Sequence, residues 1–321
     1  MFFFGHLGEI TDPQQFFREQ EYIVCRGALD DQVISSVVDL YRTHIIPSKR
    51  KYFRQGSRWD RNQMTLNGGV SNSLLNPHCY ERSSDGRFAD RILKLVSTSA
   101  VRQTLSLISG KPVDFTLYQT MFFDHATTEP HQDWCYLDSR PNGHLIAGWM
   151  ALQDILPEGI RFYVYPGTHR FVPHATYNQD ADFYDPSPIS FGIFKNFANE
   201  IRDYLASERP EMYAPPLQKG DIFFWGSRII HGSTPGTDPR LRRLSIAAHF
   251  VPDGFRFGNL ERDIIVPYYR ERYGLRYAYV DMDNYSKKQN RGLVSRSARR
   301  LAGRVKRRLN AMWAGSGTEA S

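Results

Sequence analysis

From about residue 112 onward, short runs of aromatic and β-branched residues alternate with turn-forming residues, and this pattern constrains the fold more than any other feature. Runs of this length and composition are typical of antiparallel β-strands. Short antiparallel strands in this number indicate a jelly roll or cupin-like barrel, in a mainly β domain with flanking helices. The runs predict strands over Val113–Phe123, His131–Leu137, His144–Ile155, Phe162–Tyr165, Asp221–Trp225, Ile229–Gly232 and Arg243–Val251.

Helices are expected before the strands and within one interruption of them. Apolar residues recur at three- and four-residue spacing over 33–41 and 91–108, and Asp12-Pro13 fits the start of a helix over 14–20. Residues 50–88 are polar and rich in Gly, Asn and Ser, which predicts loops. Residues 171–215 contain a helical pattern around Ala198–Ala206, and we expect them to form an insertion over the barrel mouth.

The composition indicates a globular cytoplasmic protein. Hydrophobic content of 41% and charged content of 23% are ordinary for such proteins. No apolar run reaches the roughly 18 residues of a membrane span, and the N-terminus lacks the basic start and cleavage site of a signal peptide. Cys25, Cys79 and Cys135 are scattered, without a C-x-x-C pair, which predicts reduced and buried thiols.

The net charge of +7 is concentrated in the C-terminal tail, residues 287–321, which we treat as separate from a single domain over residues 1–286. From Val294 the apolar residues recur at helical spacing among arginines, which predicts a basic amphipathic helix. Such a helix could lie on an anionic membrane surface or bind in a groove of a partner protein. A helix packed on the barrel and a solvated tail are the alternatives. The near-neutral body argues against a nucleic-acid partner.

His131-Gln132-Asp133 is the first candidate for chemistry. On a strand, His131 and Asp133 would point to the same face, because side chains alternate with a period of two. His231, at the end of a predicted buried strand, could complete the arrangement of two histidines and one carboxylate that binds non-haem Fe(II). An isolated His-x-Asp also occurs by chance and can be a purely structural pair.

Arg243 is the candidate anion-binding residue. On a strand it would share one face with Ser245, Ala247 and His249. A guanidinium that projects into a barrel can bind a carboxylate through two parallel hydrogen bonds. Arg242 and Arg240 are competitors because the turn lengths are open, and a structural ion pair is the alternative role.

Six segments, taken in order, resemble the phytanoyl-CoA dioxygenase family, whose members are Fe(II)- and 2-oxoglutarate-dependent oxygenases on a double-stranded β-helix. The resemblance runs from about residue 16 to 251 and is strongest over 118–250. The segments are His131-Gln132-Asp133, Ala147-Gly148-Trp149-Met150-Ala151-Leu152, Tyr165-Pro166-Gly167-Thr168-His169-Arg170, Lys219-Gly220-Asp221, His231-Gly232-Ser233 and Arg243.

The resemblance implies a role for each matching residue. Iron would be held by His131, Asp133 and His231. The distal carboxylate of 2-oxoglutarate would be bound by Arg243 and Ser233, with Ser245 on the same strand face as Arg243 and with Trp149 and Met121 lining the pocket. His169 is expected in a structural turn and not as a ligand. The number of residues that the family has between the second histidine and the arginine favours Arg242. The Arg-x-Ser pattern in register with His249 favours Arg243.

These expectations define an enzyme that uses Fe(II), 2-oxoglutarate and O2. It would hydroxylate or otherwise oxidise an unactivated C–H bond of a small-molecule or carrier- or lipid-linked metabolite, with succinate and CO2 as coproducts. The carboxylate of Asp133 favours hydroxylation, because halogenating relatives carry a small residue there. The alternative is a non-catalytic jelly roll that binds or senses a small molecule.

Overall fold

The structure is a computed structural model that describes residues 2–6, 8–55, 58–82, 85–110, 113–173, 191–259 and 268–280. The chain divides into two compact units, Met1–Val280 and Asp281–Ser321. All described residues belong to the first unit. The predicted basic helix of the tail therefore lies outside the described residues.

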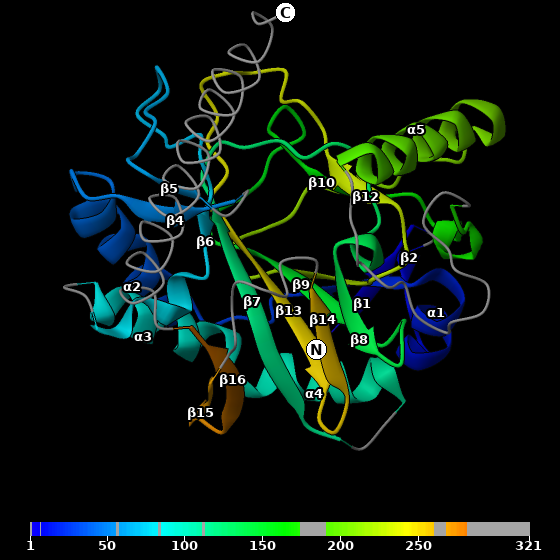
Figure 1. The fold of residues 1–321 in the computed structure, drawn as a ribbon, viewed down its shortest axis with the longest axis horizontal. Coiled ribbons are helices and arrows are strands. Elements are labelled where there is room, and N and C mark those ends of the chain that lie inside the picture. Colours follow the sequence, from blue (N-terminus) through cyan, green and yellow to red (C-terminus); the bar gives the residue numbers. More distant parts are fainter. Residues whose placement is uncertain are drawn as a thin grey trace, which may run out of the picture. The chain divides into compact units, whose positions relative to one another are not determined.

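A mainly antiparallel sheet of 12 strands forms the centre of the first unit, as shown in Figure 1. Its hydrogen-bonded order is β2-β1-β3-β11-β9-β13-β7-β6-β4-β5, and the hairpin of β15 and β16 joins through a parallel pairing of β16 with β7. The strands are β1 (Phe2–Gly5), β2 (Gly8–Glu9), β3 (Tyr22–Arg26), β4 (Tyr52–Arg54), β5 (Arg58–Asp60), β6 (Leu74–Leu75), β7 (Phe115–Phe123), β9 (Ile146–Ala151), β11 (Ile222–Gly226), β13 (Ser245–Pro252), β15 (Tyr268–Arg272) and β16 (Leu275–Tyr279).

Two small antiparallel sheets accompany the large one. One pairs β10 (Phe162–Val164) with β12 (His231–Ser233), and the other pairs β8 (Leu137–Arg140) with β14 (Arg256–Asn259). A large and a small sheet built from short antiparallel strands are the double-stranded β-helix expected from the sequence.

The register of the central strands places one row of side chains side by side. Ala247 on β13 is paired with Met121 on β7 and with Trp149 on β9, and Trp149 is paired with Phe223 on β11. Because paired residues point to the same face of a sheet, these four side chains share one face. The small Ala247 between larger neighbours leaves room over the centre of that face.

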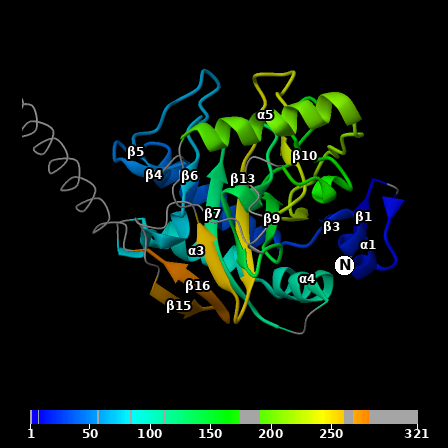
Figure 2. The same cartoon turned by 45° about the vertical axis from the view of Figure 1, so that its right-hand side comes forward.

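Helices flank the sheets, as predicted. They are α1 (Pro13–Gln20), α2 (Asp31–Leu40), α3 (Gly86–Val96), α4 (Ser99–Ser109) and α5 (Phe191–Glu208). Asp12 and Asp30 cap α1 and α2 by accepting backbone N–H groups of the first turn. Figures 1 and 2 show α5 next to β10 and β12, at the end of the strands away from α3 and α4.

The strand predicted over His131–Leu137 is wrong. His131 pairs with His231 in an isolated bridge, Asp133–Cys135 form a short 3₁₀ helix, and regular pairing resumes only at Leu137, where β8 begins. The buried amide of Gln132 donates to the carbonyls of Arg228 and Phe171. These side-chain bonds hold the segment in place of a strand ladder.

The loop prediction for residues 50–88 is also wrong in part. The segment contains the short strands β4, β5 and β6, a 3₁₀ helix over Pro77–Arg82 and the start of α3. Strands of two or three residues are too short to show a hydrophobic period, so the pattern could not reveal them. The prediction for the cysteines is confirmed, since all three are buried and none forms a disulfide with another described residue.

Helix α5 confirms the helix predicted around Ala198–Ala206 and extends it toward the N-terminus. Its buried residues Phe197 and Ile201 pack against Trp134, Cys135 and Ile230. Trp134 and Ile230 are sequence neighbours of Asp133 and His231, so this part of the insertion contacts the segments that carry the predicted metal ligands. Residues 174–190 of the insertion lie outside the described residues.

Candidate active site

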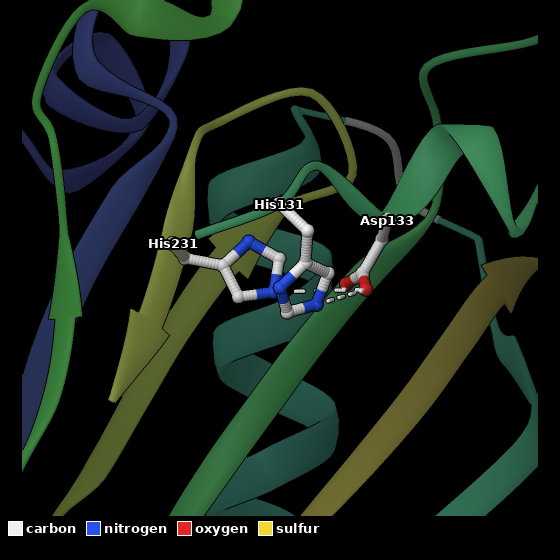
Figure 3. A group of neighbouring side chains, drawn as sticks. All are labelled: His131, Asp133 and His231. Atoms are coloured by element: carbon white, nitrogen blue, oxygen red, sulfur yellow. Dashed lines mark ion pairs between the residues drawn. The ribbon is translucent and has the colours of Figure 1, made fainter. Parts of the chain in front are cut away.

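His131, Asp133 and His231 meet in a group that could hold a metal ion. Their ligand atoms all lie within 4.8 Å of one another, and Figure 3 shows the three side chains turned toward each other. Asp133 Oδ1 is 3.6 Å from Nε2 of His131 and 3.6 Å from Nε2 of His231. Within the described part of the chain, no other group of three His, Cys, Asp or Glu residues has such an arrangement.

Backbone pairing places the two histidines opposite each other. His131 and His231 form an antiparallel bridge with N–H to carbonyl distances of 3.0 and 2.9 Å. Each Nδ1 lies beside a backbone carbonyl, that of Glu129 at 2.8 Å and that of Ile229 at 3.0 Å. An Nδ1–H that donates to a carbonyl leaves the lone pair on Nε2, which is the tautomer that a metal requires at this position.

Burial and mutual attraction set the protonation of the group. Burial raises the pKa of Asp133, but attraction to His231 and to the other nearby histidines outweighs it and holds the pKa well below its usual range. Burial lowers the pKa of His231. It also opposes charge on His131, but the neighbouring Asp133 carboxylate outweighs burial and raises the pKa of His131. One ionised carboxylate and two imidazoles are the donor set that suits non-haem Fe(II).

The metal-ligand group opens into a cavity. The cavity extends from the ligands over the row of residues described above on β7, β9 and β13. It is lined by Gln55, Met121, Phe123, Thr128, His131, Asp133, Trp149, Phe162, Trp225, His231, Gly232, Ser233, Arg243, Ala247 and His249.

Arg243 supplies a buried positive charge to this cavity. Only 1% of its surface is exposed, and its guanidinium lies 5.1 Å from the ring centre of Phe123 and 5.3 Å from that of Trp149. One amino group donates to the carbonyl of Ala126, but Nε has no hydrogen-bond partner among the described residues. Burial lowers its pKa to about 9. An unpaired buried cation beside a cavity fits an anionic ligand such as a carboxylate.

The two competing arginines are already paired with carboxylates. Arg242 donates from Nε and from an amino group to the two oxygens of Asp124, at 2.8 and 2.5 Å. Arg240 is exposed and bonds to Asp238. Neither of them lines the cavity. Among the three candidates, only Arg243 can reach a ligand beside the metal-ligand group.

Ser233, Trp149 and Met121 line the same cavity. Ser233 follows His231 on β12, and its hydroxyl accepts the N–H of Thr128 at 2.6 Å, which leaves the hydroxyl proton available to a ligand. Trp149 and Met121 are buried on the sheet face that holds Ala247. These three residues therefore share the cavity with the metal-ligand group, and their roles toward 2-oxoglutarate stay predictions.

Ser245 and His169 do not line the cavity. Ser245 is fully buried at the start of β13, and its hydroxyl has no partner within the described ranges. A contact between Ser245 and a bound ligand therefore stays a prediction. His169 lies in the 3₁₀ helix Thr168–Arg170, outside the metal-ligand group, as expected.

Two side chains beside Asp133 were not predicted as partners of this carboxylate. Trp225 Nε1–H donates to Asp133 Oδ2 at 2.9 Å, and His249 Nε2 is 3.6 Å from the same oxygen. The signal for His249 was its strand face, shared with Arg243. Trp225 was predicted only as an apolar residue of the strand Asp221–Trp225. Strand alternation nevertheless places it on the same face as Phe223.

The double-stranded β-helix, its two-histidine, one-carboxylate group and the arginine beside it define a non-haem iron oxygenase of the 2-oxoglutarate-dependent class. The sequence profile of the phytanoyl-CoA dioxygenase (PhyH) family matches residues 17–244. The chain belongs to this family. None of the helices that the structure describes combines the length and the hydropathy of a membrane span.

Curated relatives and solved structures are similar to parts of the chain. Peroxisomal phytanoyl-CoA dioxygenase from Homo sapiens is 29% identical over 123 residues, which are 38% of this chain and 32% of that protein. The Bos taurus protein is 26% identical over 156 residues, 46% of this chain and 42% of that protein. The chain thus matches less than half of the length of these relatives.

Two solved structures share the fold. The non-heme alpha ketoglutarate dependent carbocyclase SnoK from nogalamycin biosynthesis has a TM-score of 0.56 at 15% identity, covering 79% of this chain and 88% of that one. The epimerase SnoN, in complex with Fe3+, alpha ketoglutarate and nogalamycin RO, has a TM-score of 0.53 at 14% identity, covering 83% and 93%. At this identity the likeness concerns the fold alone.

Proposed function

We propose that the chain is an Fe(II)- and 2-oxoglutarate-dependent dioxygenase that hydroxylates or otherwise oxidises an unactivated C–H bond of a small-molecule or carrier- or lipid-linked metabolite. One observation carries the proposal: the guanidinium of Arg243, which has no carboxylate partner among the described residues, and the group of His131, Asp133 and His231 line a single cavity. A dicarboxylate that chelates a metal at one end needs a cation at its other end. Membership of the family supports the same function.

Each residue has one role in this proposal. Arg243 and Ser233 bind and orient the distal carboxylate, while Trp149 and Met121 exclude water from the carbon chain. Bound iron, together with 2-oxoglutarate and O2, supplies the oxidising chemistry and yields succinate and CO2. The metal would be held by the three residues His131, Asp133 and His231.

Residues 171–215 serve as the substrate lid in this proposal. Long insertions beside a rigid scaffold commonly carry recognition and move during turnover. The packing of α5 on Trp134 and Ile230 supports the assignment, because both are next to a proposed ligand. Removal of the insertion should disturb coupling to the main substrate more than metal binding. A trimmed enzyme that oxidises its substrate normally would contradict this role.

The test of function is succinate formation. The purified chain is supplied with Fe(II), 2-oxoglutarate, O2 and pooled metabolites, and product masses are searched for a gain of oxygen or a loss of two hydrogens. His231→Ala is the control that removes a proposed ligand. Succinate at the same level with both proteins, or with neither, would contradict the proposal.

The same assay decides between the enzyme and a non-catalytic jelly roll that binds a small molecule. A binding protein would retain ligand without consuming 2-oxoglutarate. The unpaired charge of Arg243 beside three potential metal ligands favours the enzyme. Cytoplasmic location and attachment of the basic tail to anionic membranes stay predictions from the sequence.

A further inference from the structure

The two oxygens of the Asp133 carboxylate have different neighbours. Oδ1 lies 3.6 Å from Nε2 of both His131 and His231. Oδ2 accepts the indole N–H of Trp225 at 2.9 Å and has His249 Nε2 at 3.6 Å. The carboxylate is therefore turned so that only one oxygen faces the two histidine nitrogens.

We propose that Trp225 is a positioning residue, whose indole N–H holds Asp133 Oδ2 and leaves Oδ1 as the single metal-binding oxygen. This inference rests on the proposed function. A carboxylate can bind a metal through one or both oxygens. Binding through both would take a position that an oxygenase needs for its cosubstrate or O2, so a donor on Oδ2 keeps that position available.

Trp225 has the rigidity that this role needs. It is 2% exposed and lies on β11, which is paired with β3 on one side and with β9 on the other. Its ring centre is 4.6 Å from that of Phe162 and 5.1 Å from that of His231. A donor on a strand that is paired at both edges, with its ring packed against Phe162 and His231, is oriented before any metal binds.

The chemistry of indole suits the role as well. Its nitrogen is a donor only, so it neither ligates a metal nor accepts a proton from the site. A hydrogen bond from a neutral donor to a carboxylate is charge-assisted and stronger than one between neutral groups. Such outer contacts of metal ligands typically contribute 10- to 100-fold to metal affinity or activity.

The test compares Trp225→Phe with wild type in anaerobic Co(II) titrations of the full chain. We expect one Co(II) per wild-type chain, and about 10- to 100-fold weaker binding by the variant. The Co(II) absorption spectrum should also change, because the second carboxylate oxygen becomes free to coordinate. Tyr22→Phe is the matched control: Tyr22 pairs with Trp225 across β3 and β11, but its hydroxyl bonds to His6. This control should keep the wild-type affinity and spectrum.

A second variant separates the hydrogen bond from the packing. Replacing the Trp225 indole by benzothiophene, through incorporation of benzothienylalanine, keeps the shape and removes only the N–H. The same loss of affinity and the same spectral change are expected. Wild-type affinity within about twofold and an unchanged spectrum in this protein would overturn the inference. Absence of Co(II) and Fe(II) binding in wild type would instead overturn the proposed function.

Discussion

Arg243 and Arg242 are adjacent in the sequence, and the structure predicts opposite consequences when each is changed to methionine. Arg243 is buried, faces the cavity and lacks a carboxylate partner among the described residues. Arg242 makes a two-pronged pair with Asp124. The first arginine is available to a ligand, whereas the second stabilises the fold.

The magnitudes follow from these contacts. Hydrogen bonds to a charged group are worth about 1.5–3 kcal/mol, so loss of the Arg243 contact should weaken 2-oxoglutarate binding by about 10- to 150-fold. Stability of the ligand-free protein should not fall, because the change removes an unpaired buried cation. Arg242→Met leaves Asp124, which is 1% exposed, without its counterion. Breaking a buried pair costs up to about 3–5 kcal/mol.

Two measurements separate the arginines. Calorimetric titration of 2-oxoglutarate into the Co(II)-loaded protein without O2 gives the affinity, and urea unfolding of the metal-free protein gives the free energy of unfolding. We expect Arg243→Met to lose affinity and keep stability, and Arg242→Met to lose stability and keep affinity once folded. A selective loss of 2-oxoglutarate binding in Arg242→Met, with normal binding by Arg243→Met, would refute the assignment.

Four further predictions concern other parts of the chain. His231→Ala should abolish stoichiometric Fe(II) binding and succinate formation; full metal binding by this variant would place the site elsewhere. Burial raises the pKa of Glu21 from 4.5 to about 8, so the folded state binds this proton more tightly than the unfolded state. The free energy of unfolding should therefore fall as the pH rises between these two values, by at most about 1.4 kcal/mol per pH unit. Glu21→Gln should remove that slope in urea unfolding at several pH values, and an unchanged slope would contradict it. Phe197→Ala should cost about 3–5 kcal/mol in the same assay, because the ring is fully buried, whereas a loss below about 1 kcal/mol would show that α5 is not part of the core. The full chain should sediment with anionic vesicles at low salt and less at physiological salt, unlike a chain ending at Asn284; equal sedimentation of both would exclude the membrane role.

The sequence by itself determined the fold class and most of the proposed site. Short runs of aromatic and β-branched residues between turn-forming residues marked β7, β9, β11 and β13, because strand composition and turn signals are local properties of the chain. The capping residue Asp12 marked the start of α1 for the same reason. The order of His131, Asp133, His231 and Arg243 then named the residues that meet in space.

Only the tertiary structure decided how those residues are arranged. Arg242 pairs with the distant carboxylate of Asp124, whereas Arg243 lines the cavity. The 3₁₀ turn at Asp133 depends on carbonyls that Gln132 reaches across the molecule. The bond from Trp225 to Asp133 joins residues 92 positions apart. Local patterns record which face a side chain occupies, but long-range contacts depend on how sheets pack, and no short segment contains that information.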